Sequence, residues 1–343
     1  MEEVFISILK WNAIIGTCLF AYGVYGNRAV KNWDEDRDSK YPAYRRYDTK
    51  NWNYLYLYLG AITLMPVRAF LGLLLTVVVF VHACFTALTT FHRFPSPHNW
   101  WGKLNVSLGS FMQSNVLPLI VGCHVTVISP QIDYSFWLGK DYKPKMMEVK
   151  NPSMVVSNHT SWLDPYMVSR VINVGYLAKK SCETTPIIGP FIKILNGMFI
   201  DRGATEAQRE KQIKDIEERQ ELVEKLSGLP PLCLFAEGGT SNGHYLLAFK
   251  KGAFAALKSI KAIVLDYRMN TVSPAYDVVQ VVPLVIIQLC QFRQQAVIYD
   301  LPIIVPTDYL FETHKDKGTE KWEIYAWAVR DIMSKAANMP TNE

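Results

Sequence analysis

Residues 69–91 form an apolar run that contains no Asp, Glu, Lys or Arg. A helix of this length can cross the hydrocarbon core of a bilayer, which needs about 20 residues. The preceding apolar stretch, residues 54–67, is too short to cross alone, and Pro66 and Arg68 divide the two. We therefore expect a kinked helical hairpin that dips into one leaflet. The alternative is a pair of buried core helices in a soluble protein.

Residues 4–25 are also mostly apolar, with interruptions at Lys10 and Asn12. They are long enough for one span, and a helix lying in the interface is the alternative. A basic polar stretch follows. If residues 4–25 cross the bilayer, this stretch should face the cytoplasm or the mitochondrial matrix. The acidic start at Glu2 and Glu3 disfavours a cleaved secretory signal and an Arg-rich transit peptide.

The composition narrows the class of protein. Half of the 343 residues are hydrophobic, which is high for a soluble enzyme and low for a transporter with many spans. The net charge of +5 suits an anionic membrane surface or phosphorylated substrates, and it is too diffuse to indicate nucleic-acid binding. The six cysteines are widely spread without a Cys-x-x-Cys pair, so we expect free thiols and no metal site.

From residue 152 onward, short apolar runs alternate with stretches of helical pattern, which predicts an α/β domain. A strand at residues 124–129 should lead into this domain. The other expected strands are residues 154–156, 175–177, 198–200, 232–235, 262–265, 278–282 and 296–299.

Four further segments have recognisable patterns. Residues 106–121 are predicted to form an amphipathic helix on the membrane surface, and residues 130–150 an inserted loop. Residues 206–226 should form a charged helix that ends before Gly228. Its expected capping box is Thr205 with Gln208, and its expected buried face is Ile213, Ile216, Val223 and Leu226. A last amphipathic helix is expected at residues 319–337, with Trp322, Tyr325 and Val329 on one side.

The candidate catalytic motif is a histidine followed five residues later by an aspartate, His159 and Asp164. The motif lies between an expected strand and an expected helix that has Asp164 as N-cap and Pro165 at its first position. Residues five apart do not share one face of a straight helix, so the two side chains can meet only if the loop folds back. A histidine held by a carboxylate is a ready general base. The alternative is a surface loop whose aspartate only caps the helix.

Three later segments follow in a fixed order. They are Gly197-Met198-Phe199-Ile200-Asp201-Arg202-Gly203, then Leu234-Phe235-Ala236-Glu237-Gly238-Gly239-Thr240, and then Val281-Val282-Pro283-Leu284. Together with the histidine motif they resemble the four blocks of the lysophospholipid acyltransferase family, of the 1-acylglycerol-3-phosphate acyltransferase type. The glycine-rich block is most similar to the lysophosphatidylcholine acyltransferase branch. Where the family usually has proline before the glutamate, this chain has Ala236.

The resemblance implies a mixed sheet flanked by helices, with acyl-CoA as co-substrate and no cofactor. It also implies that His159 acts as general base, oriented by Asp164, without a covalent enzyme intermediate. The substrate-binding candidates are Arg202, Lys179, Glu237, Gly238, Gly239 and Thr240.

Each binding candidate has an alternative role. Arg202 can hold a phosphate or form an ion pair with Glu206 at the start of a helix. Lys179 can bind phosphate or simply be solvated. Glu237 can accept from a glycerol hydroxyl or brace its loop, while the backbone N–H groups of the glycine-rich turn can hold phosphate. Val282 and Pro283 can line an acyl channel or support the sheet.

We expect four parts: residues 1–53, an apolar helix and basic linker; residues 54–125, the membrane hairpin and interfacial helix; residues 126–305, the α/β acyltransferase domain; and residues 306–343, the amphipathic tail. The expected function is transfer of a fatty acyl chain from acyl-CoA to a lysophospholipid. The expected place is the endoplasmic reticulum membrane, with the mitochondrial inner membrane as alternative. The rival interpretation is an accessory, lipid-binding subunit of a larger membrane assembly that has kept the acyltransferase fold.

Overall fold

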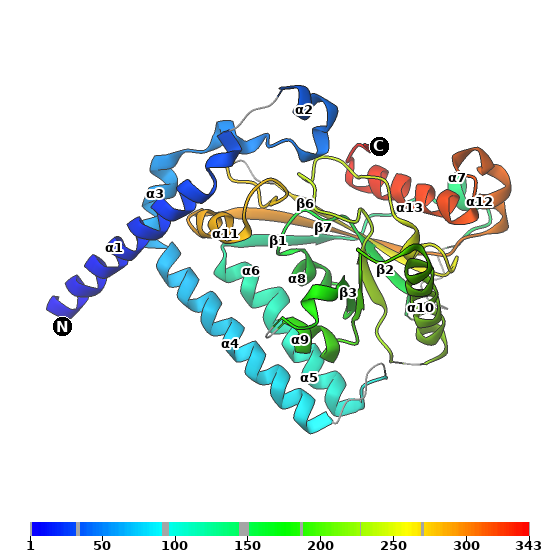
Figure 1. Ribbon diagram of the computed structural model, residues 1–343, viewed down its shortest axis with the longest axis horizontal. Helices are drawn as coiled ribbons and strands as arrows, with labels where there is room; N and C mark the ends of the chain where they lie inside the picture. Colours follow the sequence, from blue (N-terminus) through cyan, green and yellow to red (C-terminus); the bar gives the residue numbers. More distant parts are fainter. Residues whose placement is uncertain are drawn as a thin grey trace.

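The computed structural model describes residues 2–31, 35–90, 96–143, 151–185, 188–226, 228–268 and 271–342. Its centre is a seven-stranded sheet in the order β1-β7-β6-β2-β5-β3-β4 (Figure 1). Neighbouring strands run parallel except β6 and β7, which are antiparallel. The strands are β1 Cys123–Ile128, β2 Met154–Ser157, β3 Gly175–Lys179, β4 Met198–Ile200, β5 Leu232–Phe235, β6 Ile260–Tyr267 and β7 Gln294–Ile304. The predicted mixed α/β sheet is confirmed.

Both faces of the sheet are covered, as the continuous apolar strands require. Along β2, Met154 and Val156 enter one hydrophobic core, while Val155 enters the other. The helices α10 (Glu206–Lys225) and α13 (Lys321–Ala337) contribute to the first core, and α3 (Tyr54–Thr63), α8 (Asp164–Ser169) and α11 (Val281–Leu289) to the second. The remaining α-helices are α1 Glu2–Gly26, α2 Glu35–Lys40, α4 Met65–Thr90, α5 Trp100–Phe111, α6 Leu117–Ile120, α7 Ser135–Leu138, α9 Ile188–Ile194 and α12 Asp308–Thr313.

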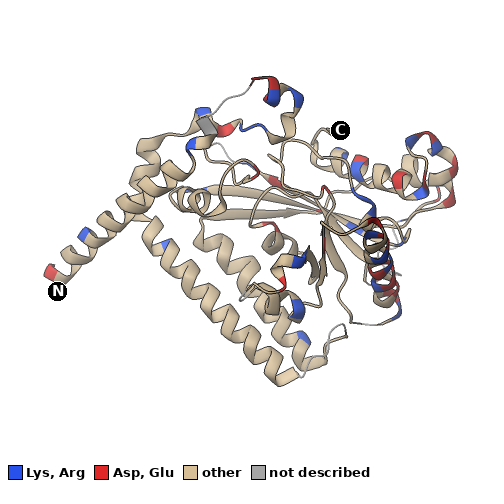
Figure 2. Cartoon of the chain, in the orientation of Figure 1, with Lys and Arg blue, Asp and Glu red and all other residues tan. Residues whose placement is uncertain are grey.

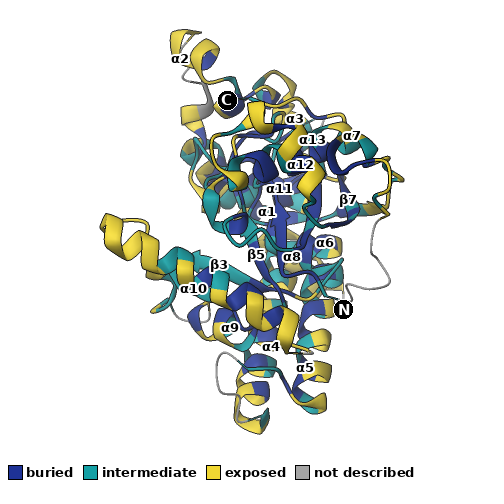
Figure 3. Ribbon diagram, turned by 90° about the vertical axis from the view of Figure 1, so that its right-hand side faces the viewer, coloured by how far each residue is buried: buried dark blue, intermediate teal, exposed yellow. Residues whose placement is uncertain are grey.

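Two helices, α1 and α4, are long and apolar enough to cross a membrane. Both are largely exposed, and Figure 2 shows them almost bare of charge. On the other side of the molecule, Figure 3 shows that the charged helix α10 also carries many exposed residues. The predicted break between the apolar stretches lies at Leu64, before Pro66. Pro66 is accommodated in the first turn of α4, where its missing N–H leaves no bond unmade. Arg68 lies within α4 and therefore does not separate the two helices. Its guanidinium donates to the Leu289 carbonyl at 3.0 Å and so links α4 to the end of α11.

The segment predicted as an amphipathic helix is helical, but it is built in three pieces. Helix α5 passes through a π-helical turn, Met112–Val116, into the short α6. In the predicted inserted loop, α7 forms over Ser135–Leu138, while residues 144–150 lie outside the described residues.

One predicted strand is wrong. Residues 278–282 lead into α11, which begins at Val281 and has Gln280 as its N-cap. A short β-branched run flanked by turn residues favours a strand, and periodicity alone cannot separate it from a buried helix. Pro283 falls in the first helical turn, where proline is tolerated.

The predicted charged helix and the predicted amphipathic helix of the C-terminal tail are both present, with one correction. In α10, the Thr205 N–H donates to Gln208 Oε1 at 2.9 Å, as expected for the capping box. Leu226 is not part of its buried face, because the helix ends at Lys225 and Leu226 is 39% exposed. In α13, Tyr325 and Val329 are fully buried, so this helix forms part of the core of the α/β domain.

Helix α3 approaches the end of α11 so closely that only glycine fits at Gly60. A Cβ added at Gly60 would lie 1.7 Å from the Cys290 carbonyl oxygen. We predict that Gly60→Ala lowers the free energy of unfolding by about 2 kcal/mol or more, because the two backbones must separate. Gly72→Ala in α4 is the matched control, since its nearest neighbour is 4.0 Å away. This control should be neutral or slightly stabilising. Thermal unfolding in detergent compares the two, and equal midpoints would contradict the prediction.

Candidate active site

The loop between β2 and α8 folds back and brings His159 to Asp164. His159 Nδ1 lies 2.7 Å from Asp164 Oδ2, and the aspartate side chain is fully buried. Asp164 was predicted as the N-cap of α8, but the N-cap is Leu163 and Asp164 is the first helical residue. The Asp164 carboxylate closes the loop that precedes the helix. The predicted loop closure is therefore confirmed.

Asp164 accepts four hydrogen bonds. Oδ2 accepts from His159 Nδ1 and also from the backbone N–H groups of Thr160 at 2.6 Å and Ser161 at 2.8 Å. Oδ1 accepts from the Tyr267 hydroxyl at 2.6 Å. Burial beside the Asp164 carboxylate raises the pKa of Tyr267, which keeps its hydroxyl protonated as a donor. A carboxylate with this set of donors is well stabilised in a buried place.

This arrangement decides the tautomer of His159. Because Asp164 Oδ2 acts as an acceptor toward every group around it, His159 Nδ1 carries the proton and Nε2 keeps its lone pair. The ring is stacked on Phe235, with centroids 4.2 Å apart, and meets the Tyr276 ring edge-on at 6.2 Å. Its side chain is 19% exposed. The imidazole is thus oriented by Asp164, Phe235 and Tyr276, and its side chain remains partly exposed.

Glu237 braces the loop. Its Oε2 accepts from the His159 backbone N–H at 2.8 Å, and its Oε1 accepts from the Leu247 N–H at 3.0 Å. With both oxygens occupied by backbone donors and only 5% of the residue exposed, Glu237 is not placed to contact a substrate. Of its two predicted roles, the bracing one fits the structure.

A cavity of about 510 Å³ opens beside His159. Its polar end includes Lys179 and Arg202 together with the glycine turn at Gly238 and Gly239. Its apolar walls come from α4, through Leu75, Val79 and Phe80, and from α9, through Phe191 and Ile192. The structure therefore gathers residues from three of the four sequence blocks around one apolar space.

Arg202 is held toward this turn rather than toward α10. Its Nη1 donates to the Gly238 carbonyl at 2.8 Å. Among the ion pairs of the described residues, none joins Arg202 to Glu206. Lys179 is exposed at the end of β3 and has no ion-pair partner in the same part of the chain. Both cations are therefore available to a phosphate.

The fourth block does not reach the cavity. Val282 is 61% exposed, and Pro283 is buried against α1, where a Cβ at Gly26 would lie 2.4 Å from its ring. Neither residue borders the space beside His159, so the predicted acyl-channel role does not hold for this cavity. The cause is the helix that replaces the predicted strand. Thr240 also lies outside the cavity wall.

The sequence motifs did not reveal the role of several residues of the site, including Phe235, which lies within one of the motifs. Tyr267 reaches Asp164 only through the register of β6 against β2, and Phe235 lies under the His159 ring because β5 is the other neighbour of β2. The α4 residues line the cavity through tertiary packing, which no local pattern reports. The described ranges contain no group of three or more His, Cys, Asp or Glu side chains arranged to hold a metal ion.

Burial raises the pKa of Glu237 to about 7, against the opposing effect of its two backbone donors. The folded state then holds a proton that the unfolded state releases near pH 4.5, so this group's contribution to stability is lost as the pH rises from about 4.5 to 7. We predict that the unfolding free energy of the wild type, measured relative to Glu237→Gln, falls across this window. Unfolding midpoints at a series of pH values test this, and a difference that does not change with pH would contradict it.

The sequence of the chain is similar to those of known acyltransferases. The sequence profile of the Acyltransferase family matches residues 139–286. A lysophospholipid acyltransferase of Arabidopsis thaliana is 29% identical over 57% of this chain and 47% of its own length. A lysophosphatidylcholine acyltransferase of Drosophila melanogaster is 27% identical over 56% of this chain and 34% of its own length.

A solved structure, the 1-acyl-sn-glycerophosphate acyltransferase of Thermotoga maritima, aligns with a TM-score of 0.45 and 17% identity, over 79% of this chain and 97% of that one. The chain spans about half or less of the length of the curated relatives named above. The matched region contains the His159–Asp164 pair and the glycine turn. Over this region the chain is similar to lysophospholipid acyltransferases.

Proposed function

We propose that the protein transfers a fatty acyl chain from acyl-CoA to the free hydroxyl of a lysophospholipid. The observation that carries this proposal is an oriented His159–Asp164 pair whose histidine lines an apolar cavity, together with the cations Lys179 and Arg202, which line the same cavity. An alcohol acceptor needs a base, a phosphate group needs positive charge, and a fatty chain needs an apolar wall. The cavity offers all three to one ligand.

In the proposed reaction, His159 Nε2 takes the proton of the acceptor hydroxyl as its oxygen attacks the thioester carbonyl carbon. The tetrahedral intermediate then collapses, the C–S bond breaks, and the CoA thiolate takes the proton from the imidazolium. Asp164 stabilises the imidazolium between these two steps through the bond to Nδ1. No covalent enzyme intermediate is needed.

Arg202 and Lys179 are proposed to hold a phosphate of one of the substrates. Because the Gly238 carbonyl fixes one N–H of Arg202, the guanidinium is oriented before a ligand arrives. This preorganisation reduces the entropy lost on binding. Gly238 and Gly239 leave the backbone of the turn open, since no atom lies within 4 Å of a Cβ added at Gly239.

The membrane position is proposed from α4. The helix presents Phe70, Leu73 and Val77 as exposed apolar side chains, while Leu75 and Val79 line the cavity. An acceptor lipid can therefore reach His159 from the bilayer along α4, as soluble acyl-CoA approaches from water. Endoplasmic reticulum and mitochondrial inner membrane both fit this placement. An accessory role without chemistry is not favoured, because lipid binding alone does not require the ordered His159–Asp164 pair.

His159→Ala should lower kcat for acyl transfer by about 10²- to 10⁴-fold, the usual contribution of a general base. The assay follows labelled acyl-CoA into a panel of lysophospholipids in the same membranes. His124→Ala is the control, since His124 is exposed on β1 away from the cavity. Folded wild type that is inactive on a broad panel would instead support the accessory role.

Arg202→Ala should raise KM for the substrate whose phosphate it holds by about 10-fold or more, because a hydrogen bond to a charged group is worth about 1.5–3 kcal/mol. The substrate whose KM rises, acyl-CoA or lysophospholipid, identifies the bound phosphate. Arg209→Ala, an exposed substitution on α10, serves as control. Unchanged KM values for both substrates would exclude the phosphate role of Arg202.

A further inference from the structure

The segment that joins α2 to α3, residues 42–52, is unusually well buried for a polar linker. It contains two 3₁₀ turns, Pro42–Tyr44 and Asp48–Asn51. Ala43 is fully buried, and the side chains of Arg46 and Asp48 are only 5% and 6% exposed. Figure 1 shows this segment, which we call the strap, in blue between α2 and α3.

The first end of the strap is bonded to the glycine-rich loop after β5. Asn242 Nδ2 donates to the carbonyls of Pro42 at 2.8 Å and Arg45 at 2.9 Å, and the Asn242 backbone N–H donates to the Ala43 carbonyl at 2.8 Å. Asn242 is itself 7% exposed. One asparagine therefore donates to three carbonyls of a segment whose own regular structure is limited to two short 3₁₀ turns.

This glycine-rich loop is in turn bonded to the catalytic loop. The Ser241 N–H donates to the His159 carbonyl at 2.9 Å. Gly243 has a φ of +76° and packs so tightly that a Cβ there would lie 2.9 Å from Thr160 Oγ1. A displacement of Asn242 is thus passed directly to the two residues at the start of the His159 loop.

The second end of the strap is bonded to the loop after β6. Arg46 forms an ion pair with Asp48 at 2.8 Å and donates to the Ser273 and Ala275 carbonyls. Asp48 Oδ2 also accepts from the Ser273 N–H at 2.9 Å and from Trp52 Nε1 at 2.7 Å. These contacts bind the pair to the loop after β6, while Arg46 Nε and Asp48 Oδ1 have no hydrogen-bond partner among the described residues.

The loop after β6 contacts the catalytic loop from the other side. Ala275 forms an isolated β-bridge with Ser161, and the ring of Tyr276 meets that of His159 edge-on. The strap thus holds two loops, and these two loops enclose the His159 loop from opposite sides. The strap, which contacts both the loop after β5 and the loop after β6, lies about 200 residues earlier in the chain than the first of these loops.

We propose that the strap is a positioning element for His159, and that Asn242 and Arg46 are its positioning residues. The inference rests on the proposed function of His159 as base. Neither residue borders the cavity, so each acts through the loop that it fixes. Rate depends steeply on such placement, because a shift of about 1 Å can cost roughly 100-fold in a reaction that requires aligned groups.

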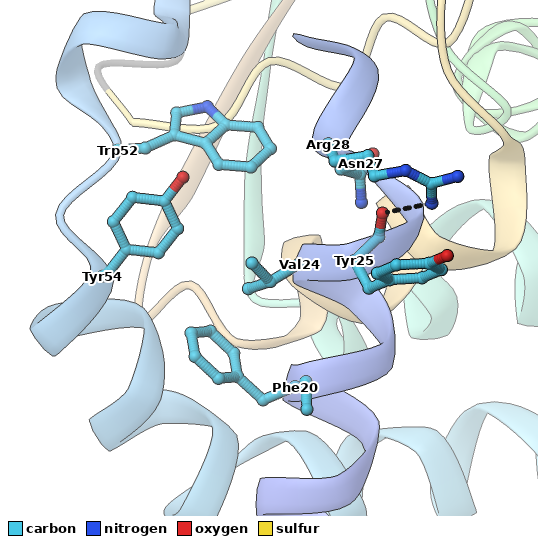
Figure 4. Close-up of a pocket in the computed structure, with 8 residues that line it drawn as sticks. Phe20, Val24, Tyr25, Asn27, Arg28, Trp52 and Tyr54 are labelled. Carbon is cyan, nitrogen blue, oxygen red and sulfur yellow. Dashed lines mark hydrogen bonds between the residues drawn. The ribbon is translucent and has the colours of Figure 1, made fainter. Parts of the chain in front are cut away.

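The strap also connects the site to the apolar helices. Just beyond its second 3₁₀ turn, Trp52 and Tyr54 line a hollow of about 510 Å³ with Phe20 and Val24 of α1 (Figure 4). Beside this hollow, α1 contacts α3, which begins at Tyr54, two residues after the end of the strap. The position of His159 is in this way linked to the docking of α1.

The test compares the full-length wild type with Asn242→Ala in membranes. We expect kcat for acyl transfer to fall about 10- to 100-fold, while KM for acyl-CoA and for the lysophospholipid each change less than about twofold. Asn151→Ala is the matched control, because Asn151 Nδ2 also donates to a carbonyl, that of Leu229 at 2.8 Å, but far from the catalytic loop. Its kcat should stay near that of wild type.

Hydrogen–deuterium exchange gives a second readout that does not need activity. Exchange should rise in residues 157–165 of Asn242→Ala and remain unchanged there in Asn151→Ala. If wild type shows no acyl transfer, the proposed function fails and the exchange experiment still tests the strap. Wild-type exchange and kcat in Asn242→Ala would overturn the strap proposal, as would equal losses in Asn151→Ala.

If Asn242→Ala does not fold, Arg46→Lys provides the same test from the other end of the strap. Lysine can keep the charge beside Asp48, but it lacks the fork that reaches both the Ser273 and Ala275 carbonyls. We expect kcat to fall with both KM values unchanged, and exchange to rise at residues 157–165 and 273–276. Wild-type values for both readouts would overturn the proposal.

Discussion

The buried carboxylate of Asp164 is the interaction on which the rest of the site depends. It is placed in the protein interior, where an ionised group is stable only if enough donors surround it. Those donors come from the His159 loop itself and from Tyr267 on β6. The Asp164 carboxylate therefore holds the conformation of the loop, and the N–H groups of the loop in turn stabilise the negative charge of Asp164. The histidine is the one donor of this set that also faces a cavity, which is why the structural requirement and the chemical one coincide at His159.

The features that were predicted correctly from the sequence are mostly local. The closure of His159 onto Asp164 involves six consecutive residues, and the turn-forming residues between them are sufficient to indicate it. The α10 capping box is likewise contained within four residues, Thr205 to Gln208. Seven of the eight expected strands are present because each is a short apolar run enclosed by turn residues.

The features that were missed depend on contacts between distant segments. Tyr267 reaches Asp164 through strand register, and the strap reaches the site through hydrogen bonds to backbone carbonyls, which carry no side-chain signature. The error at residues 278–282 has the same origin, since the burial of Leu284 and Ile287, which follow the run, favours a helix that begins at Val281. For this reason Val282 and Pro283 lie outside the cavity beside His159.

Helix α4 is at once a wall of the cavity and a surface that is apolar on its outer side. A helix embedded in lipid adjusts its tilt to the thickness of the hydrocarbon layer. With α4 in a bilayer as proposed, each change of tilt moves Leu75 and Val79 relative to the rigid sheet that carries His159. The width of the cavity would then depend on the thickness of the membrane as well as on the protein. Because that thickness follows from the average length of the lipid acyl chains, the product of acyl transfer would influence the cavity in which the transfer takes place.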